Sequence, residues 1–112
     1  MRKLSKKRAA QERRLRKVEA ELDQYEENQY CFFFPSEPKT EYHHIIPKSQ
    51  NAQLIDDKEN LLPVGRRAHD ILTFGATQDI RELPMDRLQL YLIRMAHVDY
   101  NYYRRFIVKL NL

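Results

Sequence analysis

The chain has 112 residues, of which 42% are hydrophobic, and its formal net charge at pH 7 is +4. This length suits one domain with a modest core, and the apolar content excludes an intrinsically disordered chain. No apolar run is long enough to span a bilayer, the basic N-terminus lacks the apolar stretch of a secretory signal, and the single cysteine excludes an internal disulfide. We therefore expect a single domain over residues 1–112 that works in the reducing cytoplasm.

The first predicted element is a helix over residues 3–28, which contain no Gly or Pro and are rich in Ala, Glu, Arg, Lys and Leu. Residues from Leu15 to Tyr25 continue a stripe with spacings of four and three, so this half is expected to pack on the rest of the domain. The basic first turns are expected to extend into solvent or along a ligand. A short dimeric coiled coil is an alternative role for the same stripe.

The charge of this helix is unevenly distributed. Nine of the first 17 residues are Lys or Arg, against one acid, Glu12, and the sign reverses from Glu19 to Glu27. Such a basic arm is expected to attract a polyanion such as nucleic acid, although a solvated helix end that keeps the protein soluble has the same composition. The candidate contacts on this helix are Lys6, Lys7, Arg8, Arg13 and Arg14.

The middle of the chain is predicted to form a strand, a loop, a second strand and a short helix. The stretch YHHII at residues 42–46 is aromatic and β-branched and stops at Pro47, whereas LLPV at residues 61–64 is a second short apolar stretch. Pro63 confines this second strand to a sheet edge or end. A short helix over residues 66–74 follows, with a glycine directly after it as the C-cap.

Two further segments complete the predicted fold. Phe32 to Phe34 lie in a turn-rich connector with two prolines and are expected to fill the core beneath it. Residues 85–110 follow Pro84 and lack Gly, and they predict a second long helix whose apolar face is interrupted by Asp99. The expected fold class is α+β, with a central unit of two strands and a helix between an N-terminal and a C-terminal helix.

Four polar residues of the central unit supply the groups that metal-assisted hydrolysis of a phosphodiester needs. That reaction requires ligands for a divalent cation, a base that titrates near neutral pH, and a partner that orients the base. His43, His44, Asn60 and His69 are of these types. Neighbouring strand residues point to opposite faces, so the adjacent histidines can serve one site only near a strand end or a bulge. The alternative is one packed and one exposed histidine, with Asn60 as a turn residue.

The stretch EYHHIIPKS, followed by DDKENLLPVGRRAHD, resembles the motif of the HNH endonucleases, the ββα-metal nuclease finger. The resemblance covers about residues 31–75 and implies that His43 and His69 bind a divalent metal. It implies that His44 is the general base for the attacking water, and that Asn60 orients His44 and braces the loop. Mg²⁺ is the expected metal, with Mn²⁺, Ni²⁺ or Zn²⁺ as alternatives.

The chain departs from the family pattern in two respects. Many members have a zinc knuckle of two Cys-x-x-Cys pairs, but Cys31 is the only cysteine here, so a four-cysteine zinc site is excluded. Some relatives have another histidine one turn after the helical one, where this chain has Thr73. The resemblance therefore implies two protein ligands, with water and a DNA phosphate completing the metal's shell.

The resemblance implies a small free-standing endonuclease of the kind found in phages and mobile elements. Such an enzyme would act on double-stranded DNA in the cytoplasm, which for a phage protein is that of the host. Lys48, Arg66 and Arg67 are further candidate phosphate contacts. A homodimer or a larger phage DNA-processing complex are alternative assemblies, and no membrane partner is expected. Two rival functions are a non-catalytic nucleic-acid-binding or assembly module that retains the finger, and a helix-mediated interaction protein with structural histidines.

Overall fold

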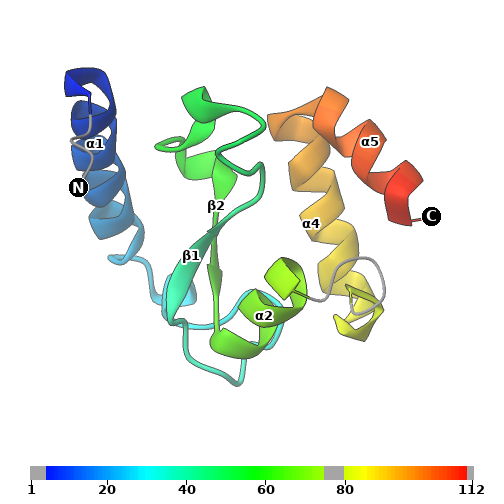
Figure 1. Cartoon of the computed structure of the whole chain (residues 1–112). Helices are drawn as coiled ribbons and strands as arrows, with labels where there is room; N and C mark the ends of the chain where they lie inside the picture. Colours follow the sequence, from blue (N-terminus) through cyan, green and yellow to red (C-terminus); the bar gives the residue numbers. More distant parts are fainter. Residues whose placement is uncertain (1–4, 75–79, 111–112) are drawn as a thin grey trace.

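The computed structural model describes residues 5–74 and 80–110 (Figure 1). Its helices are α1 (Lys6–Leu22), α2 (Arg66–Phe74), α4 (Met85–Val98) and α5 (Tyr100–Leu110), and its strands are β1 (Glu41–His44) and β2 (Leu61–Val64). Short 3-10 turns lie at Glu26–Gln29, Ala52–Leu54, Lys58–Asn60 and Ile80–Glu82. The predicted α+β class is confirmed, and β1 and β2 form a two-stranded antiparallel sheet. None of the helices in these two ranges has the length and apolar character of a membrane span.

Helix α1 ends earlier than the predicted helix over residues 3–28. Two side-chain amides bond to carbonyls at the C-terminal end of the helix. Asn28 Nδ2 donates to the carbonyl of Leu22 at 2.8 Å, and Gln29 Nε2 donates to the carbonyl of Asp23 at 2.6 Å. These bonds satisfy carbonyls that further helical turns would otherwise use. The chain therefore leaves the α-helix at Leu22 and continues into a 3-10 turn.

The packed face of α1 is shorter than predicted for the same reason. Leu15 is buried and Val18 and Leu22 are half-buried, but Tyr25 lies beyond the helix and is 58% exposed. Leu15 packs with Ile55 and Leu61 in a small cluster that is separate from the main core. Helix α1 is therefore held against one side of the hairpin, whereas α4 and α5 lie on the other side (Figure 1).

The first strand of the hairpin also ends earlier than predicted. The register pairs Glu41 with Val64 and His44 with Leu61. Beyond His44, the amide of Ile46 donates to the side-chain Oδ1 of Asn60 at 2.7 Å instead of to a strand partner. Ile45 and Ile46 are nevertheless fully buried, which agrees with their apolar character but places them after the strand.

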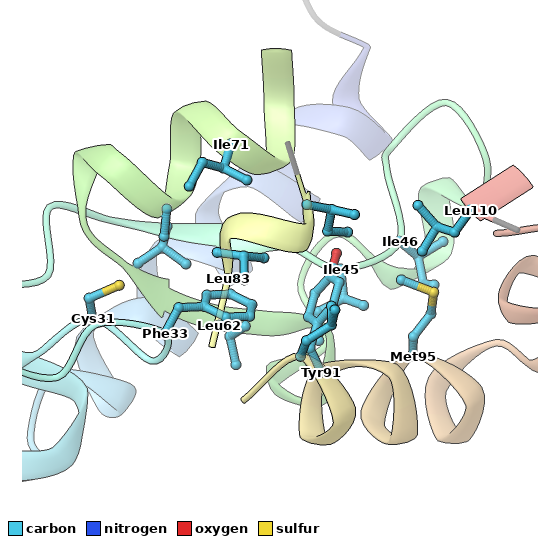
Figure 2. Close-up of a cluster of buried hydrophobic side chains, with 14 residues drawn as sticks. Cys31, Phe33, Ile45, Ile46, Leu62, Ile71, Leu83, Tyr91, Met95 and Leu110 are labelled. Carbon is cyan, nitrogen blue, oxygen red and sulfur yellow. The ribbon is translucent and has the colours of Figure 1, made fainter. Parts of the chain in front are cut away.

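The main core lies between the hairpin, α2, α4 and α5 (Figure 2). Phe33 is fully buried in it, and Phe32 and Phe34 pack against it half-buried, as the aromatic run predicted. Helix α2 has the predicted bounds, and it begins directly after Gly65. A Cβ at Gly65 would lie 2.9 Å from the carbonyl oxygen of Pro38, so this close approach requires glycine. The C-cap predicted at Gly75 lies outside the described residues.

The single C-terminal helix predicted over residues 85–110 is divided at Asp99. Asp99 has an extended backbone, its N–H still donates to the carbonyl of Met95 at 2.9 Å, and its side chain accepts from the N–H of Tyr102 at 3.0 Å. It thus ends α4 and caps the start of α5. Because of this break, α5 turns back to pack beside α4 (Figure 1).

Candidate metal and catalytic site

His43 lies on β1 and faces helix α4. Its Nε2 is 3.3 Å from the hydroxyl of Tyr91, and burial lowers the pKa of His43 to about 4, with smaller effects from the neighbouring His69 and His44. Burial also raises the pKa of Tyr91, so its hydroxyl keeps its proton. His43 is therefore a neutral imidazole that α4 holds in one orientation, which is the protonation state a metal ligand needs.

His69 lies on α2, and its two ring nitrogens have different surroundings. Its Nε2 is 3.4 Å from a carboxylate oxygen of Glu41 and 3.4 Å from the hydroxyl of Thr73. Its Nδ1 is buried and has no hydrogen-bond partner. A carboxylate can only accept, so Glu41 favours the tautomer with the proton on Nε2 and the lone pair on Nδ1. Asp70 Oδ1 is 3.8 Å from Nδ1, beyond hydrogen-bonding distance, so in this tautomer the lone pair of Nδ1 is available to a metal.

The structure brings these two imidazoles together. The ring centroids of His43 and His69 are 6.4 Å apart, and the rings are nearly perpendicular at 80°. Metal–nitrogen bonds are about 2.0–2.1 Å long, so two imidazoles on one metal require these rings to approach by roughly 1–2 Å. Within residues 5–74 and 80–110, no group of three or more His, Cys, Asp or Glu side chains converges on one point. The residues thus fit a two-imidazole site with open positions.

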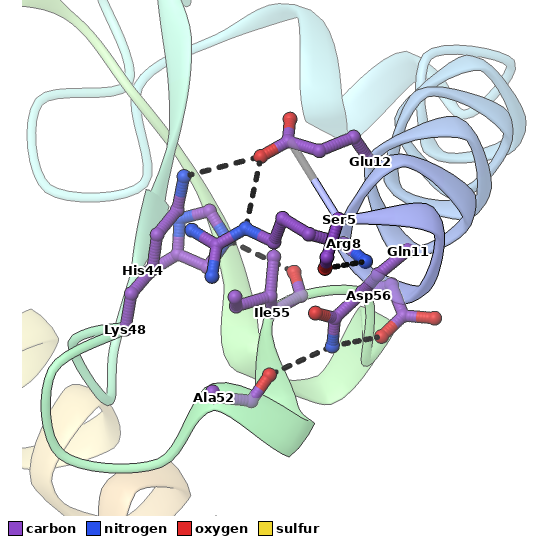
Figure 3. A network of polar contacts seen from close by, with 9 residues as sticks. All are labelled: Ser5, Arg8, Gln11, Glu12, His44, Lys48, Ala52, Ile55 and Asp56. Atoms are coloured by element: carbon purple, nitrogen blue, oxygen red, sulfur yellow. Dashed lines mark hydrogen bonds and ion pairs between the residues drawn. The ribbon is translucent and has the colours of Figure 1, made fainter. Parts of the chain in front are cut away.

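His44 has a different set of neighbours (Figure 3). Its Nε2 is 2.9 Å from the backbone carbonyl of Ile55. A carbonyl can only accept, so Nε2 carries the proton and Nδ1 has the free lone pair. Burial lowers the pKa of His44; the bond to Ile55 opposes this effect, and the positive charge of Lys48 adds to it. His44 is therefore neutral near pH 7 and has one nitrogen available to accept a proton.

Asn60 is fully buried, and its side chain contacts backbone groups only. Oδ1 accepts from the N–H of Ile46, and Nδ2 donates to the carbonyls of Ile46 at 3.2 Å and Leu54 at 3.0 Å. The side chain of Asn60 therefore makes no hydrogen bond to His44, whose orientation the family resemblance assigned to it. Asn60 braces both ends of the loop between the strands, and Ile55, directly after Leu54, holds His44.

The two adjacent histidines contact opposite sides of the hairpin, as the strand period requires. His43 contacts α4, whereas His44 contacts the loop that packs under α1. Both residues nevertheless line one cleft of about 470 Å³, between the end of β1 and helix α5. This cleft is the concave surface at which both histidines can meet one ligand.

Some of the candidate phosphate contacts are exposed side chains, and the others lie close to a carboxylate. Lys6, Lys7 and Arg13 are exposed on α1. The remaining candidates on α1 and in the loop have acidic neighbours: Arg14 binds Asp56 at 2.9 Å, and Glu12 is 3.5 Å from Arg8 and 4.0 Å from Lys48 (Figure 3). Before His69, Arg66 lies 3.7 Å from both Glu41 and Asp70, and Arg67 lies 3.4 Å from Glu37.

The sequence did not indicate two residues that contact the candidate metal ligands, Glu41 and Tyr91. Glu41 stands two positions before His43 and could have been noticed as a carboxylate on the same face of the strand. Tyr91 continues the apolar stripe of α4, three residues after Leu88 and four before Met95, so its pattern indicates a core aromatic residue. Only the packing of α4 against β1 reveals its contact with His43.

Comparisons of the chain with protein-family models, with curated proteins and with solved structures gave no match.

Proposed function

We propose that the chain is a metal-dependent endonuclease of the HNH type that hydrolyses phosphodiester bonds in DNA. The observation that carries this proposal is the approach of His43 and His69, whose rings lie 6.4 Å apart with an unpartnered nitrogen on His69. The order of β1, β2 and α2 along the chain agrees with a ββα-metal finger. His43 and His69 would hold the cation, and Mg²⁺ is the first candidate.

The residues of the chain have separate roles in this reaction. When bound, a divalent cation would stabilise charge on the phosphate and on the leaving 3′ oxygen. His44 takes a proton from the attacking water on Nδ1, the water oxygen bonds to phosphorus, and the bond to the 3′ oxygen breaks. The products are a 5′-phosphate and a 3′-hydroxyl, whose proton comes from solvent. Ile55 holds His44 in the tautomer that this step needs.

Tyr91 and Glu41 act outside the reacting atoms as positioning residues. Each contacts the Nε2 of one imidazole, Tyr91 on His43 and Glu41 on His69. Such outer contacts fix the tautomer and the orientation of a metal-binding histidine. Glu41 thereby favours a lone pair on Nδ1 of His69, whereas the Tyr91 hydroxyl can donate or accept and so orients the ring of His43 without selecting its tautomer.

The second candidate function is a non-catalytic nucleic-acid-binding module built on the same hairpin. The observation that favours it is the absence of a third converging ligand within residues 5–74 and 80–110. The neutral state of His44 and its fixed tautomer favour the enzyme instead, because a binding module has no need of a base in this position.

The test of the enzyme is nicking of a supercoiled plasmid in Mg²⁺, Mn²⁺ or Ni²⁺, followed on agarose gels, with EDTA as the control. We expect metal-dependent conversion to the open circular form. His69→Ala should weaken metal binding by about 10-fold or more, measured by calorimetry, because one of the two protein ligands is lost. No nicking in any of the three metals would leave the binding module as the better interpretation.

Helix α1 is proposed to add affinity that does not depend on sequence. Lys6 and Lys7 are exposed, and contacts between lysine and phosphate make binding sensitive to salt. We expect Lys6→Gln/Lys7→Gln to weaken duplex binding and to make the slope of log K against log salt shallower by about 0.9 for each lost contact. The measurement is fluorescence anisotropy with a labelled duplex at several KCl concentrations.

The matched control for this prediction is Lys58→Gln/Arg81→Gln, which removes two exposed charges from 3-10 turns elsewhere in the fold. Deleting the arm is the poorer experiment, because residues 2–17 include Leu15, which is buried against Ile55. Equal slopes for the two double variants would contradict a specific role for α1.

A further inference from the structure

Helix α5 lies outside the segment that resembles a nuclease finger, but one of its faces lines the same cleft as His43 and His44. The cleft-facing residues at this end of the helix are Tyr102, Arg105, Phe106, Lys109 and Leu110. Their spacings of three and four place them on one side of the helix. Arg104 is not among them and lines a second exposed surface with Asn101 and Val108, and Arg105 borders both surfaces.

The charge of the cleft is one-sided. Among the described residues that line it, Arg105 and Lys109 are cations and none is Asp or Glu. Within residues 5–74 and 80–110, neither cation forms an ion pair with a carboxylate, in contrast to Arg14, Arg66 and Arg67. Two exposed cations beside a concave surface without an acid are suited to bind an anion.

Aromatic rings pack helix α5, which carries the two cations, against α4. Phe106 stacks on Tyr102 with ring centroids 6.0 Å apart, and Phe106 packs against Tyr91 at 6.5 Å. Tyr91 in turn lies 6.1 Å from the ring of His43. A continuous series of aromatic rings therefore joins the helix that carries Arg105 to the proposed metal ligand. The guanidinium of Arg105 is 5.9 Å from the Tyr102 ring.

We propose that Arg105 and Lys109 bind backbone phosphates of the DNA strand that enters this cleft. The inference rests on the proposed function for its ligand and adds a second contact surface, opposite the β1 end. One turn of helix separates the two cations, about 6 Å along the axis, so both can face the cleft at once. In this arrangement α5 holds the strand while the hairpin carries the histidines.

The test is binding of a fluorescein-labelled duplex in EDTA, measured by anisotropy at several KCl concentrations. We expect Arg105→Ala/Lys109→Ala to bind more weakly and to make the slope of log K against log salt shallower by about 1.8, or about 0.9 for each contact. Arg104→Ala is the matched control, since it removes the neighbouring charge from the other face and should leave the slope unchanged. Arg105→Lys should retain most of the affinity.

The outcomes separate this inference from the proposed function. Nicking by the wild type together with equal slopes for the wild type and the Arg105/Lys109 variant would overturn the inference and leave the enzyme intact. The inference is also overturned if Arg104→Ala makes the slope shallower by about 0.9, the effect of a full contact, or if the wild type binds no duplex in EDTA. If Arg105→Ala/Lys109→Ala alone binds the duplex more weakly and the wild type nicks DNA in no metal, the phosphate contact is supported and the proposed enzymatic function is contradicted. Circular dichroism melting checks that each variant is folded.

Discussion

Replacing His44 with alanine is expected to lower the rate of plasmid nicking by roughly 100-fold to 10,000-fold, the usual contribution of a general base. The expected loss depends on one nitrogen of His44, Nδ1. Ile55 accepts the proton of Nε2 at 2.9 Å, so Nδ1 is the atom that would take the proton from water. The measurement is the initial rate of open-circle formation at saturating metal, because His44 is not proposed to bind the cation.

Two further variants show whether the loss comes from the base. His44→Gln has an amide that can still donate to Ile55 but cannot accept a proton at neutral pH, so it should be as inactive as His44→Ala. His97→Ala removes an exposed histidine from α4 and should nick like the wild type. Retention of activity in His44→Gln would contradict the role of His44 as a base, and equal losses in His97→Ala would indicate a general effect.

Replacing Asn60 with alanine is expected to lower the free energy of unfolding by about 3 kcal/mol, because it leaves buried backbone groups without partners. The amide of Ile46 and the carbonyls of Ile46 and Leu54 all bond to this side chain. Asn60 itself has 0% exposure, so little water can replace these bonds. For a domain of this size the melting temperature should fall by roughly 10–20 °C.

Asn51 provides the matched control in the same loop. Its side chain accepts one hydrogen bond, from the N–H of Gln53 at 3.2 Å, at the exposed start of a 3-10 turn. Asn51→Ala should therefore cost about 1 kcal/mol or less. Urea unfolding of both variants, with equal m-values, gives the comparison. Similar losses at the two positions would mean that Asn60 does not brace the hairpin.

The sequence predicted the elements of the central unit well because their signals are local. The bounds of α2 followed from the apolar pattern between Gly65 and Gly75, and β2 followed from LLPV. The end of β1 was not predictable in the same way. Ile45 and Ile46 are β-branched and favour a strand, but the ladder stops because Asn60, distant in sequence, takes the next amide.

The approach of His43 to His69 could be anticipated only through the family resemblance, since their spacing alone indicates no contact. Tyr91 could not be anticipated at all, because its link to His43 depends on how α4 packs. That Asn60 bonds to the backbone and not to the ring of His44 could not be anticipated for a related reason. An asparagine can bond to a side chain or to the backbone, and only the loop geometry decides between them.

Asp99 also sets the angular phase of α5. Each residue of an α-helix turns the next side chain by about 100°, and the cap at Asp99 determines where this count begins. Inserting one residue after the cap would rotate the whole helix face, so that the position now held by Arg105 would be taken by its neighbour Arg104. Val108 would likewise take the position of Lys109, so the cleft would lose one of its two cations while the sequence of α5 remained unchanged. An insertion or deletion at this junction therefore changes which residues face the cleft more than most substitutions within the helix do.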